Sequence, residues 1–345
     1  MTVWLHRPST FAPAEDGPLH GWRLAVKDNI DVAGEPTTGG LPRLRRTASR
    51  SAPVVERLVG AGAVYVGKTN LDQLATGVVG LRTPYGAPTN PLDPTLVPGG
   101  SSSGSAVAVA TGEADIGLAT DTAGSGRVPA ACCGIVGLKP APGALPLDGV
   151  LPASPSFDCV SWFTRTVDEA VAVAGALGLD WSPKAGDWKV GGSDDVDLAP
   201  FFEAGDLLYQ GALLAERTAA IGDLLDVEDD GVVDVVRRVV ARGRAYSGVD
   251  VYRAQQRVAE LKQATAAVWD EYDVLAVPTV PSIPTVAEVE ADPIASNVRL
   301  SRYTTFANVL GLAALTVPTP EGSRTLLAPP GREPLLTELG MAMTE

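Results

Sequence analysis

Two serine-rich turns lie close together in the first half of the chain. The first is PGGSSSGS over residues 98–105, and the second is TDTAGSGR over residues 120–127. Ser101 in the first turn and Ser125 in the second are 24 positions apart. A serine that attacks a carbonyl carbon needs a place on a tight turn, where neighbouring backbone N–H groups can hold the developing oxyanion. The two turns therefore predict a site of nucleophilic catalysis.

The base of such a site is unlike that of the best-known serine hydrolases. The chain has two histidines, His6 and His20, both in the polar N-terminal segment. A serine, histidine and aspartate triad needs an imidazole held by a buried carboxylate. Neither histidine lies in a stretch that predicts a rigid, buried position, so the sequence favours a base of another type.

Lys27 is the candidate for that base. It directly follows the apolar residues 24–26, which predict a short buried strand, and it precedes a polar turn. A lysine acts as a base only in its neutral form, which burial favours by lowering the pKa. A second hydroxyl, supplied by the run 100–102, could relay the proton between the amine and a distant serine. The alternative is a solvated surface lysine.

The second turn could hold negative charge. Consecutive amides of Thr122, Ala123, Gly124 and Ser125 form the kind of nest that binds anions, which suits an oxyanion hole. A phosphate-binding loop is the alternative, but this turn does not carry the pattern G-x-x-x-x-G-K-[ST] and the predicted helix follows the first turn instead. That helix also argues against reading the first turn as a flexible linker.

The segments around these turns predict an α/β fold with a central mixed sheet covered by helices on both faces. Apolar β-branched runs alternate with helical patterns, as such folds require. The predicted strands are 24–26, 64–67, 116–119, 135–138, 274–277 and 314–317. The predicted helices are 52–61, 105–112, 200–225, 232–246, 251–271 and 306–312. A helix N-cap is predicted at 68–70, and a surface connection at 183–196.

Composition limits the partners and the compartment. The chain has 345 residues and a net charge of −14, which argues against nucleic acid or an anionic membrane as partner. Three cysteines without metal-ligand spacing fit a reducing compartment. No segment predicts a signal peptide or a transmembrane helix. We therefore expect a cytoplasmic protein that uses no cofactor and no metal.

Together these motifs resemble the amidase signature family, hydrolases that use a Ser–cis-Ser–Lys triad in a mixed α/β fold. The resemblance rests on Lys27, GGSSSGSAVAVATG (99–112), TDTAGSGRVPAACCGIVGLKP (120–140), VLAVPTVPSIP (274–284) and FANVLGLAALTVP (306–318). It implies that Ser125 is the acyl-forming nucleophile and that Lys27 is the general base. It also implies that Ser101 is the bridging serine and follows a non-proline cis peptide bond.

Within the family, the second turn narrows the expected substrate. Most members have Gly-Gly-Ser-[Ile/Val]-Arg there, whereas residues 123–127 of this chain are AGSGR. This variant resembles allophanate hydrolases, as do the segments 201–221, 243–262 and 284–297. The resemblance implies cleavage of the terminal amide of a small carboxylated urea, allophanate (N-carboxyurea), with release of ammonia. Carboxybiuret, malonamate or a neutral amide are alternative substrates, and a non-catalytic structural role is the alternative to an enzyme.

A carboxylated substrate needs a cation in so acidic a protein, and arginine suits bidentate carboxylate binding. The resemblance points to Tyr209 and Arg217 as the substrate-binding residues. An ideal helix would separate them by about 12 Å along its axis, so we expect long side chains or a break at Gly211 to bring them together. The alternative is a solvated Arg217 that pairs with Glu216 or Asp223.

Some features have simpler interpretations, and the chain is short for this family. Lys68 could cap a helix or pair with Asp72, and Cys132 and Cys133 could shape the packing behind the second turn. Material is missing near 184–198 and at the C-terminal end, compared with the family. We expect residues 1–345 to form a single compact amidase domain, with its core in 20–180 and 200–330 and without a C-terminal accessory domain. The sequence leaves open whether two copies form a homodimer.

Overall fold

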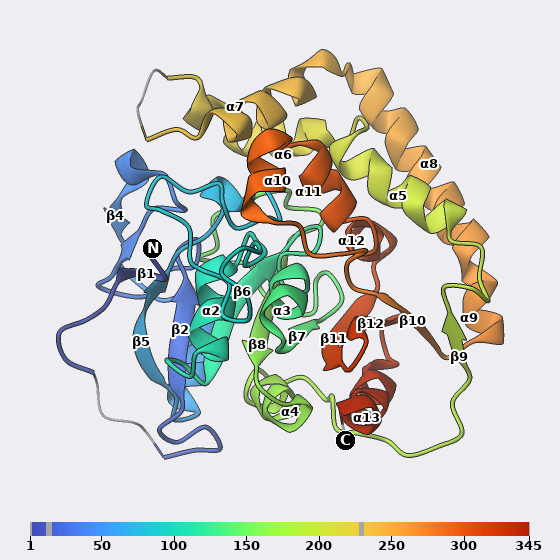
Figure 1. Cartoon of the computed structure of the whole chain (residues 1–345), viewed down its shortest axis with the longest axis horizontal. Helices are drawn as coiled ribbons and strands as arrows, with labels where there is room; N and C mark the ends of the chain where they lie inside the picture. Colours follow the sequence, from blue (N-terminus) through green and yellow to red (C-terminus); the bar gives the residue numbers. More distant parts are fainter. Residues whose placement is uncertain (1, 12–15, 228–230, 345) are drawn as a thin grey trace.

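A computed structural model describes residues 2–11, 16–227 and 231–344. Within these ranges the centre of the molecule is a ten-stranded sheet in the order β1-β5-β2-β6-β8-β7-β11-β12-β10-β9, and β3 pairs with β4 separately (Figure 1). Strand β2 is parallel to β5 and β6, β10 is parallel to β9, and the other neighbours in the large sheet are antiparallel. The predicted mixed α/β fold is confirmed.

The elements have the following bounds. The strands are β1 (Trp4–His6), β2 (Arg23–Lys27), β3 (Pro36–Thr37), β4 (Arg46–Thr47), β5 (Val64–Thr69), β6 (Ile116–Asp121), β7 (Val136–Lys139), β8 (Cys159–Thr164), β9 (Val190–Gly192), β10 (Val274–Pro278), β11 (Ala313–Thr319) and β12 (Gly322–Ala328). The helices are α1 (Pro53–Gly60), α2 (Ser103–Ala110), α3 (Val128–Cys133), α4 (Val167–Ala176), α5 (Ala199–Tyr209), α6 (Leu214–Ile221), α7 (Asp234–Ala241), α8 (Gly248–Ala266), α9 (Val268–Glu271), α10 (Val286–Ala291), α11 (Ala295–Leu300), α12 (Thr305–Leu310) and α13 (Glu333–Thr344).

Each face of the sheet carries its own apolar layer. Along β2, Leu24 and Val26 belong to one layer and Ala25 to the other, because side chains alternate between the faces of a strand. The first layer is completed by apolar residues of α1, α4 and α13. The other face is covered by α2 and α3, and further along the sheet by α5, α8 and α12 (Figure 1). Helices therefore cover both faces, as the sequence predicts.

Small side chains let α2 lie directly on the sheet. A Cβ atom added at Gly117 of β6 would come 2.7 Å from the carbonyl oxygen of Ser105, and one at Gly104 would meet the backbone of Asn70 at 2.6 Å. Larger residues would push the helix away from the strands. The close packing fixes the first serine turn, which leads into α2, against the end of β6.

Parallel pairing brings Lys27 and the second serine turn to the same edge of the sheet. In the register of β2 and β6, Val26 lies opposite Leu118. Since both strands run in the same direction, Lys27 at the end of β2 emerges near the end of β6, where the second turn begins. Two segments about 90 positions apart in the sequence thus meet at one point.

Several element predictions need correction. The predicted helix 200–225 is interrupted after Tyr209, and no helix starts at 68–70, because β5 continues to Thr69. Helix α3 follows the second turn, just as α2 follows the first, so a helix is not a feature of the first turn alone. The surface connection 183–196 contributes the edge strand β9, and β12 and α13 follow the last predicted strand. Within the described residues, no helix has the length and apolar character needed to cross a membrane.

Candidate active site

Lys27 lies at the centre of a buried group of hydroxyls. Its side chain is 0% exposed, and its Nζ donates to Ser101 Oγ at 2.7 Å and to Thr120 Oγ1 at 2.8 Å. The solvated surface lysine considered above is therefore excluded. The hydrogen bond between Lys27 and Ser101 is the first half of the predicted proton relay.

The surroundings of Lys27 favour a neutral amine. Burial lowers the pKa of Lys27 to about 7, although the negative charges of Asp72, Asp121 and Asp158 act to raise it. The positive charge of Arg217 lowers the same pKa further. A substantial neutral fraction is therefore present at neutral pH, and a neutral amine can accept a proton.

Thr120 and Asn29 support the lysine, and sequence reasoning did not single them out. Thr120 Oγ1 accepts hydrogen bonds from Lys27 Nζ and, at 3.0 Å, from Asn29 Nδ2. The Thr120 carbonyl accepts from Ser102 Oγ at 3.2 Å. Thr120 stands at the start of the second motif, which is the signal that could have pointed to it. These contacts hold the Lys27 amine in one place.

Ser101 lies in a rigid, buried part of the first turn. The Gly100–Ser101 peptide bond is cis, as the family resemblance implies. The carbonyl oxygen of Ser101 accepts from the N–H of Asp72 at 2.9 Å, and Gly100 N–H donates to Val78 at 2.8 Å. A Cβ atom at Gly100 would lie 2.1 Å from a carboxylate oxygen of Asp72. These contacts do not fit a flexible linker.

Ser125 lies in the turn between β6 and α3 and is 3% exposed. The Asp121 carboxylate accepts from the N–H of Gly124 at 2.8 Å and from that of Gly126 at 2.9 Å, one residue on either side of Ser125. This single carboxylate fixes the shape of the turn. No hydrogen bond joins Ser125 to Ser101 in the part of the chain that the structure describes, so the second half of the relay stays a prediction.

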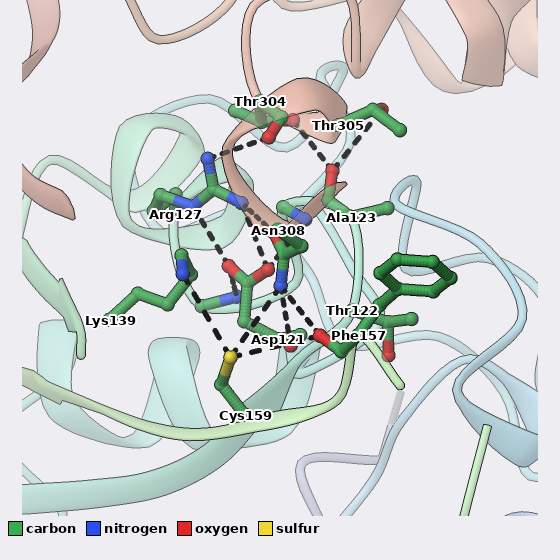
Figure 2. Close-up of polar contacts among 12 residues, drawn as sticks. Asp121, Thr122, Ala123, Arg127, Lys139, Phe157, Cys159, Thr304, Thr305 and Asn308 are labelled. Carbon is green, nitrogen blue, oxygen red and sulfur yellow. Dashed lines mark hydrogen bonds and ion pairs between the residues drawn. The ribbon is translucent and has the colours of Figure 1, made fainter. Parts of the chain in front are cut away.

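The turn is anchored by a buried ion pair. Arg127 Nε and Nη2 donate to the two carboxylate oxygens of Asp121, each at 2.9 Å. Arg127 also donates to the Thr304 carbonyl and to Asn308 Oδ1, each at 2.8 Å. The Asn308 Nδ2 group in turn donates to the Asp121 carbonyl at 2.9 Å (Figure 2). Burial favours the neutral carboxyl of Asp121, but the charge and hydrogen bonds of Arg127, with the Lys139 charge and the Gly126 N–H, together keep the Asp121 pKa below its usual value.

The predicted oxyanion amides are not equivalent. Because Gly124 N–H donates to Asp121, it is directed toward the ion pair, and the prediction for this residue needs correction. The Ala123 carbonyl points to the start of α12, where it accepts from Thr304 Oγ1 at 2.8 Å (Figure 2). The amides of Thr122, Ala123 and Ser125 remain the candidate donors to an oxyanion.

Tyr209 and Arg217 are brought together by a break between two helices. Helix α5 ends at Tyr209 and α6 begins at Leu214, and Arg217 Nη2 donates to Tyr209 Oη at 2.8 Å. Arg217 is 1% exposed, so the solvated alternative is wrong. Tyr209 also lines a small hollow with Thr305, whose hydroxyl lies 3.4 Å from the Ala123 carbonyl oxygen. Thr305 thus lies between this hollow and the second serine turn.

Three other predicted features have structural roles. Lys68 is buried beside Asp28, at 3.4 Å, and donates to the Ile30 carbonyl at 2.6 Å, so it does not pair with Asp72. Burial raises the pKa of the Cys132 and Cys133 thiols, which favours their unreactive protonated form. Among the described residues, no group of three or more acidic, histidine or cysteine side chains could hold a metal ion.

With this geometry in place, comparison with known proteins identifies the family. The family model described as Amidase matches residues 8–197. The chain belongs to the amidase family. It is 37% identical over 347 aligned residues to a urea amidolyase of Saccharomyces cerevisiae, an alignment that covers 87% of this chain and 19% of the yeast protein.

Solved structures of related proteins have the same fold. The structure superimposes on an allophanate hydrolase of Kluyveromyces lactis with a TM-score of 0.89 and 33% identity, covering 94% of this chain and 61% of that one. It is also similar to the urea amidolyase of Kluyveromyces lactis, with a TM-score of 0.87, 33% identity and coverage of 93% and 22%. The chain therefore spans about a fifth of the urea amidolyases that it matches.

Proposed function

We propose that this amidase hydrolyses the terminal amide of allophanate and releases ammonia. The observation that carries the proposal is the contact between the buried cation Arg217 and the phenol of Tyr209. The Arg217 charge is close enough to lower the pKa of Lys27. An amidase site beside a buried cation suits a small amide that carries a carboxylate. The similarity to a urea amidolyase and to an allophanate hydrolase supports the same substrate.

In the proposed acylation step, neutral Lys27 accepts a proton from Ser101 while Ser101 accepts one from Ser125. The Ser125 oxygen then forms a bond to the amide carbonyl carbon. The amides of Thr122, Ala123 and Ser125 stabilise the oxyanion. When the carbonyl re-forms, the C–N bond breaks and the proton held by Lys27 returns through Ser101 to the departing nitrogen, which leaves as ammonia.

In the deacylation step, water replaces the amine. The relay takes a proton from the water as its oxygen attacks the acyl carbon, and the proton then returns to Ser125 as the ester bond breaks. The product is N-carboxycarbamate. Throughout both steps the carboxylate of the substrate is held by Arg217, and the Tyr209 hydroxyl orients that guanidinium.

Ammonia release from a panel of amides tests this proposal. We expect activity on allophanate to exceed that on biuret, malonamate and indole-acetamide, and Ser125→Ala to abolish it. Arg217→Ala should lower turnover of the carboxylated substrates far more than that of indole-acetamide. Equal loss on both substrate types would remove the carboxylate clamp from the proposal. A serine-directed probe that fails to label Ser125 would favour the non-catalytic alternative.

The remaining sequence predictions are proposals of the same kind. We infer that the segments 20–180 and 200–330 form one domain, which is supported by their contributing neighbouring strands to the same sheet. We also propose that the chain acts in the cytoplasm and that two copies form a homodimer. Sedimentation velocity of the purified chain tests the dimer directly.

A further inference from the structure

Three arginines in the described part of the chain have guanidinium groups that are almost completely buried. They are Arg82 (4% exposed), Arg127 (0%) and Arg217 (1%). Arg127 is paired with Asp121, but neither Arg82 nor Arg217 has a carboxylate within 4.0 Å among the described residues. Burying a charge is unfavourable unless an opposite charge accompanies it. The structure therefore contains two buried cations for which the described residues supply no direct counter-ion.

The two guanidinium groups meet at Thr76. Arg217 Nη1 donates to Thr76 Oγ1 at 2.9 Å and to the Ala75 carbonyl at 3.2 Å. Arg82 Nη1 donates to the Thr76 carbonyl at 3.1 Å, and its Nη2 donates to the Pro293 carbonyl at 2.7 Å. All these acceptors are neutral oxygens. The two cations are held side by side, although their like charges repel each other.

Both arginines keep one N–H group without a partner. Arg82 Nε and Arg217 Nε are fully buried and have no hydrogen-bond acceptor. A buried donor that lacks an acceptor is costly, more so on a charged group. Two such donors on neighbouring cations provide the hydrogen bonds and the charge that one carboxylate requires.

The nearby Asp72 does not fill this role. Its carboxylate oxygens accept from the N–H of Gly80 at 3.0 Å and of Arg82 at 2.8 Å. Its charge is felt by both Arg82 and Lys27, since it raises the pKa of each, but it forms no ion pair with either. Asp72 therefore offsets the charge of Arg82 only from a distance.

The backbone that presents Thr76 has an uncommon conformation. Leu74 and Ala75 have φ angles of 50° and 52°, and they are the only residues other than glycine with positive φ among those described. Non-glycine residues adopt this region at an energetic cost, which usually marks a functional segment. Here the conformation directs the Ala75 carbonyl and the Thr76 hydroxyl to Arg217. The segment 74–76 is thus built to hold the two arginines together.

We propose that Arg82 and Arg217 together bind the carboxylate of the substrate, with the Nε–H groups of both directed at its oxygens. The identity of the substrate rests on the function proposed above, whereas the two-arginine anion site rests on the geometry alone. Bound carboxylate supplies the counter-charge that both buried cations lack. A carboxylated amide therefore binds more tightly than a neutral one, because only the carboxylate forms charge-assisted hydrogen bonds with both arginines.

Binding measurements on a Ser125→Ala background test this site without turnover. The probe is malonate, which carries two carboxyl groups one atom apart, as allophanate carries an amide and a carboxylate. We expect Arg82→Gln to weaken malonate binding roughly 10- to 100-fold in titration calorimetry, similar to Arg217→Gln. Arg82→Lys keeps the charge but loses the fork of donors, so a smaller loss is expected.

The control is Arg302→Gln. Arg302 lines the small hollow together with Tyr209, but it is exposed and its guanidinium lies 3.5 Å from the Asp206 carboxylate. It should leave malonate affinity unchanged. Thermal unfolding of each variant, with and without malonate, shows whether the chain is folded and whether the anion stabilises it.

The outcomes separate the two proposals. Unchanged malonate affinity in both folded Arg82 variants would overturn the two-arginine site and leave the proposed function standing. Failure of the unaltered chain to release ammonia from allophanate, with malonate binding intact, would overturn the function alone. The Arg82→Lys variant with Ser125 intact gives a second test. If it loses kcat/KM equally for malonamate and indole-acetamide, Arg82 has only a structural role and the inference is overturned.

Discussion

Lys27 combines a depressed pKa with a fixed position, and each property has a separate cause. Burial lowers the pKa to about 7, while the hydroxyls of Ser101 and Thr120 hold the amine in place. An unfolded lysine has a pKa near 10.5. The unfolded chain therefore binds more protons than the folded chain between about pH 7 and 10.5, so this residue costs stability at neutral pH and below, and the cost declines as the pH rises.

The first prediction concerns the pH dependence of activity. Because only neutral Lys27 accepts a proton, kcat/KM should rise as the pH increases through about 7 and level off above pH 8. The initial rate of ammonia release between pH 5 and 9 measures this. Lys27→Met should remove activity and, at pH 6, increase the free energy of unfolding. A flat profile would show that lysine is not the base.

The second prediction concerns Thr120 as a positioning residue. Thr120→Val keeps the shape of the side chain but removes the oxygen that accepts from Lys27 and Asn29. We expect kcat to fall by about tenfold or more, because a hydrogen bond to a charged group contributes about 1.5–3 kcal/mol. The rising limb of the pH profile should move to lower pH, since a lost acceptor disfavours the ammonium.

Ser105→Ala is the matched control for Thr120→Val. The Ser105 hydroxyl is buried on α2 and contacts the Thr69 hydroxyl and the Leu118 carbonyl, not the Lys27 amine. Its loss should affect stability and leave the pH profile in place. An identical pH profile in Thr120→Val and in the parent enzyme would contradict the positioning role.

The three residues proposed to react could be singled out from the sequence, whereas the residues that support them could not. Lys27, Ser101 and Ser125 stand in local motifs that can be read without knowing the fold. Arg127 and Asn308 could not be assigned, because Asn308 reaches Asp121 across 187 positions and only the packing of α12 against the end of β6 brings them together. Gly124 was misassigned because the motif does not show that the Asp121 carboxylate turns back to bind its amide.

At the scale of elements, the join between α5 and α6 brings together the proposed substrate-binding pair, Tyr209 and Arg217. A Cβ atom at Gly211 would lie 2.8 Å from Leu207 Cα and 2.9 Å from its carbonyl oxygen, so only glycine allows this tight turn. The backbone must shift to accommodate any side chain there. Because Tyr209 and Arg217 flank the turn, such a shift changes how they meet.

Gly211→Ala is therefore our third prediction. We expect KM for allophanate to rise about tenfold or more with little change in kcat, since the reacting residues lie elsewhere. Steady-state kinetics measures the split. The control is Gly175→Ala in α4, where an added Cβ meets nothing within 4 Å; it should stabilise the protein by up to about 1 kcal/mol and leave KM unchanged. Equal effects of the two substitutions would contradict the role of the join.

Apolar runs in the sequence were enough to predict some of the elements. Helix α1 and strands β2, β5 and β6 were found within one or two residues by their apolar patterns. Strand β8 was missed, and burial does not explain the difference, because β6 was found although it too is buried along its whole length. Helix α4 carried a readable signal, the capping box of Thr166 and Glu169, that was overlooked.

At the scale of the whole molecule, the net charge of −14 opposes the approach of an anionic substrate. Salt screens this long-range repulsion, whereas contacts with buried arginines are screened much less. As the fourth prediction, kcat/KM for allophanate should increase when the ionic strength is raised from about 0.01 to 0.15 M. Indole-acetamide, which is neutral, is the reference substrate and should show no change. A decrease for allophanate would mean that local attraction dominates.

The residues proposed to react and the pair proposed to bind the substrate carboxylate belong to different parts of the fold. Lys27 and the nucleophile turn are attached to the neighbouring strands β2 and β6, whereas Tyr209 and Arg217 are on α5 and α6, which do not belong to the sheet (Figure 1). Mutations that remodel residues 199–221 would therefore alter the contact between Arg217 and Tyr209, and with it the charge that lowers the pKa of Lys27. For evolution, and for anyone recombining such enzymes in the laboratory, exchange of this helical segment would change the accepted amide and the pH range of the hydrolytic core together.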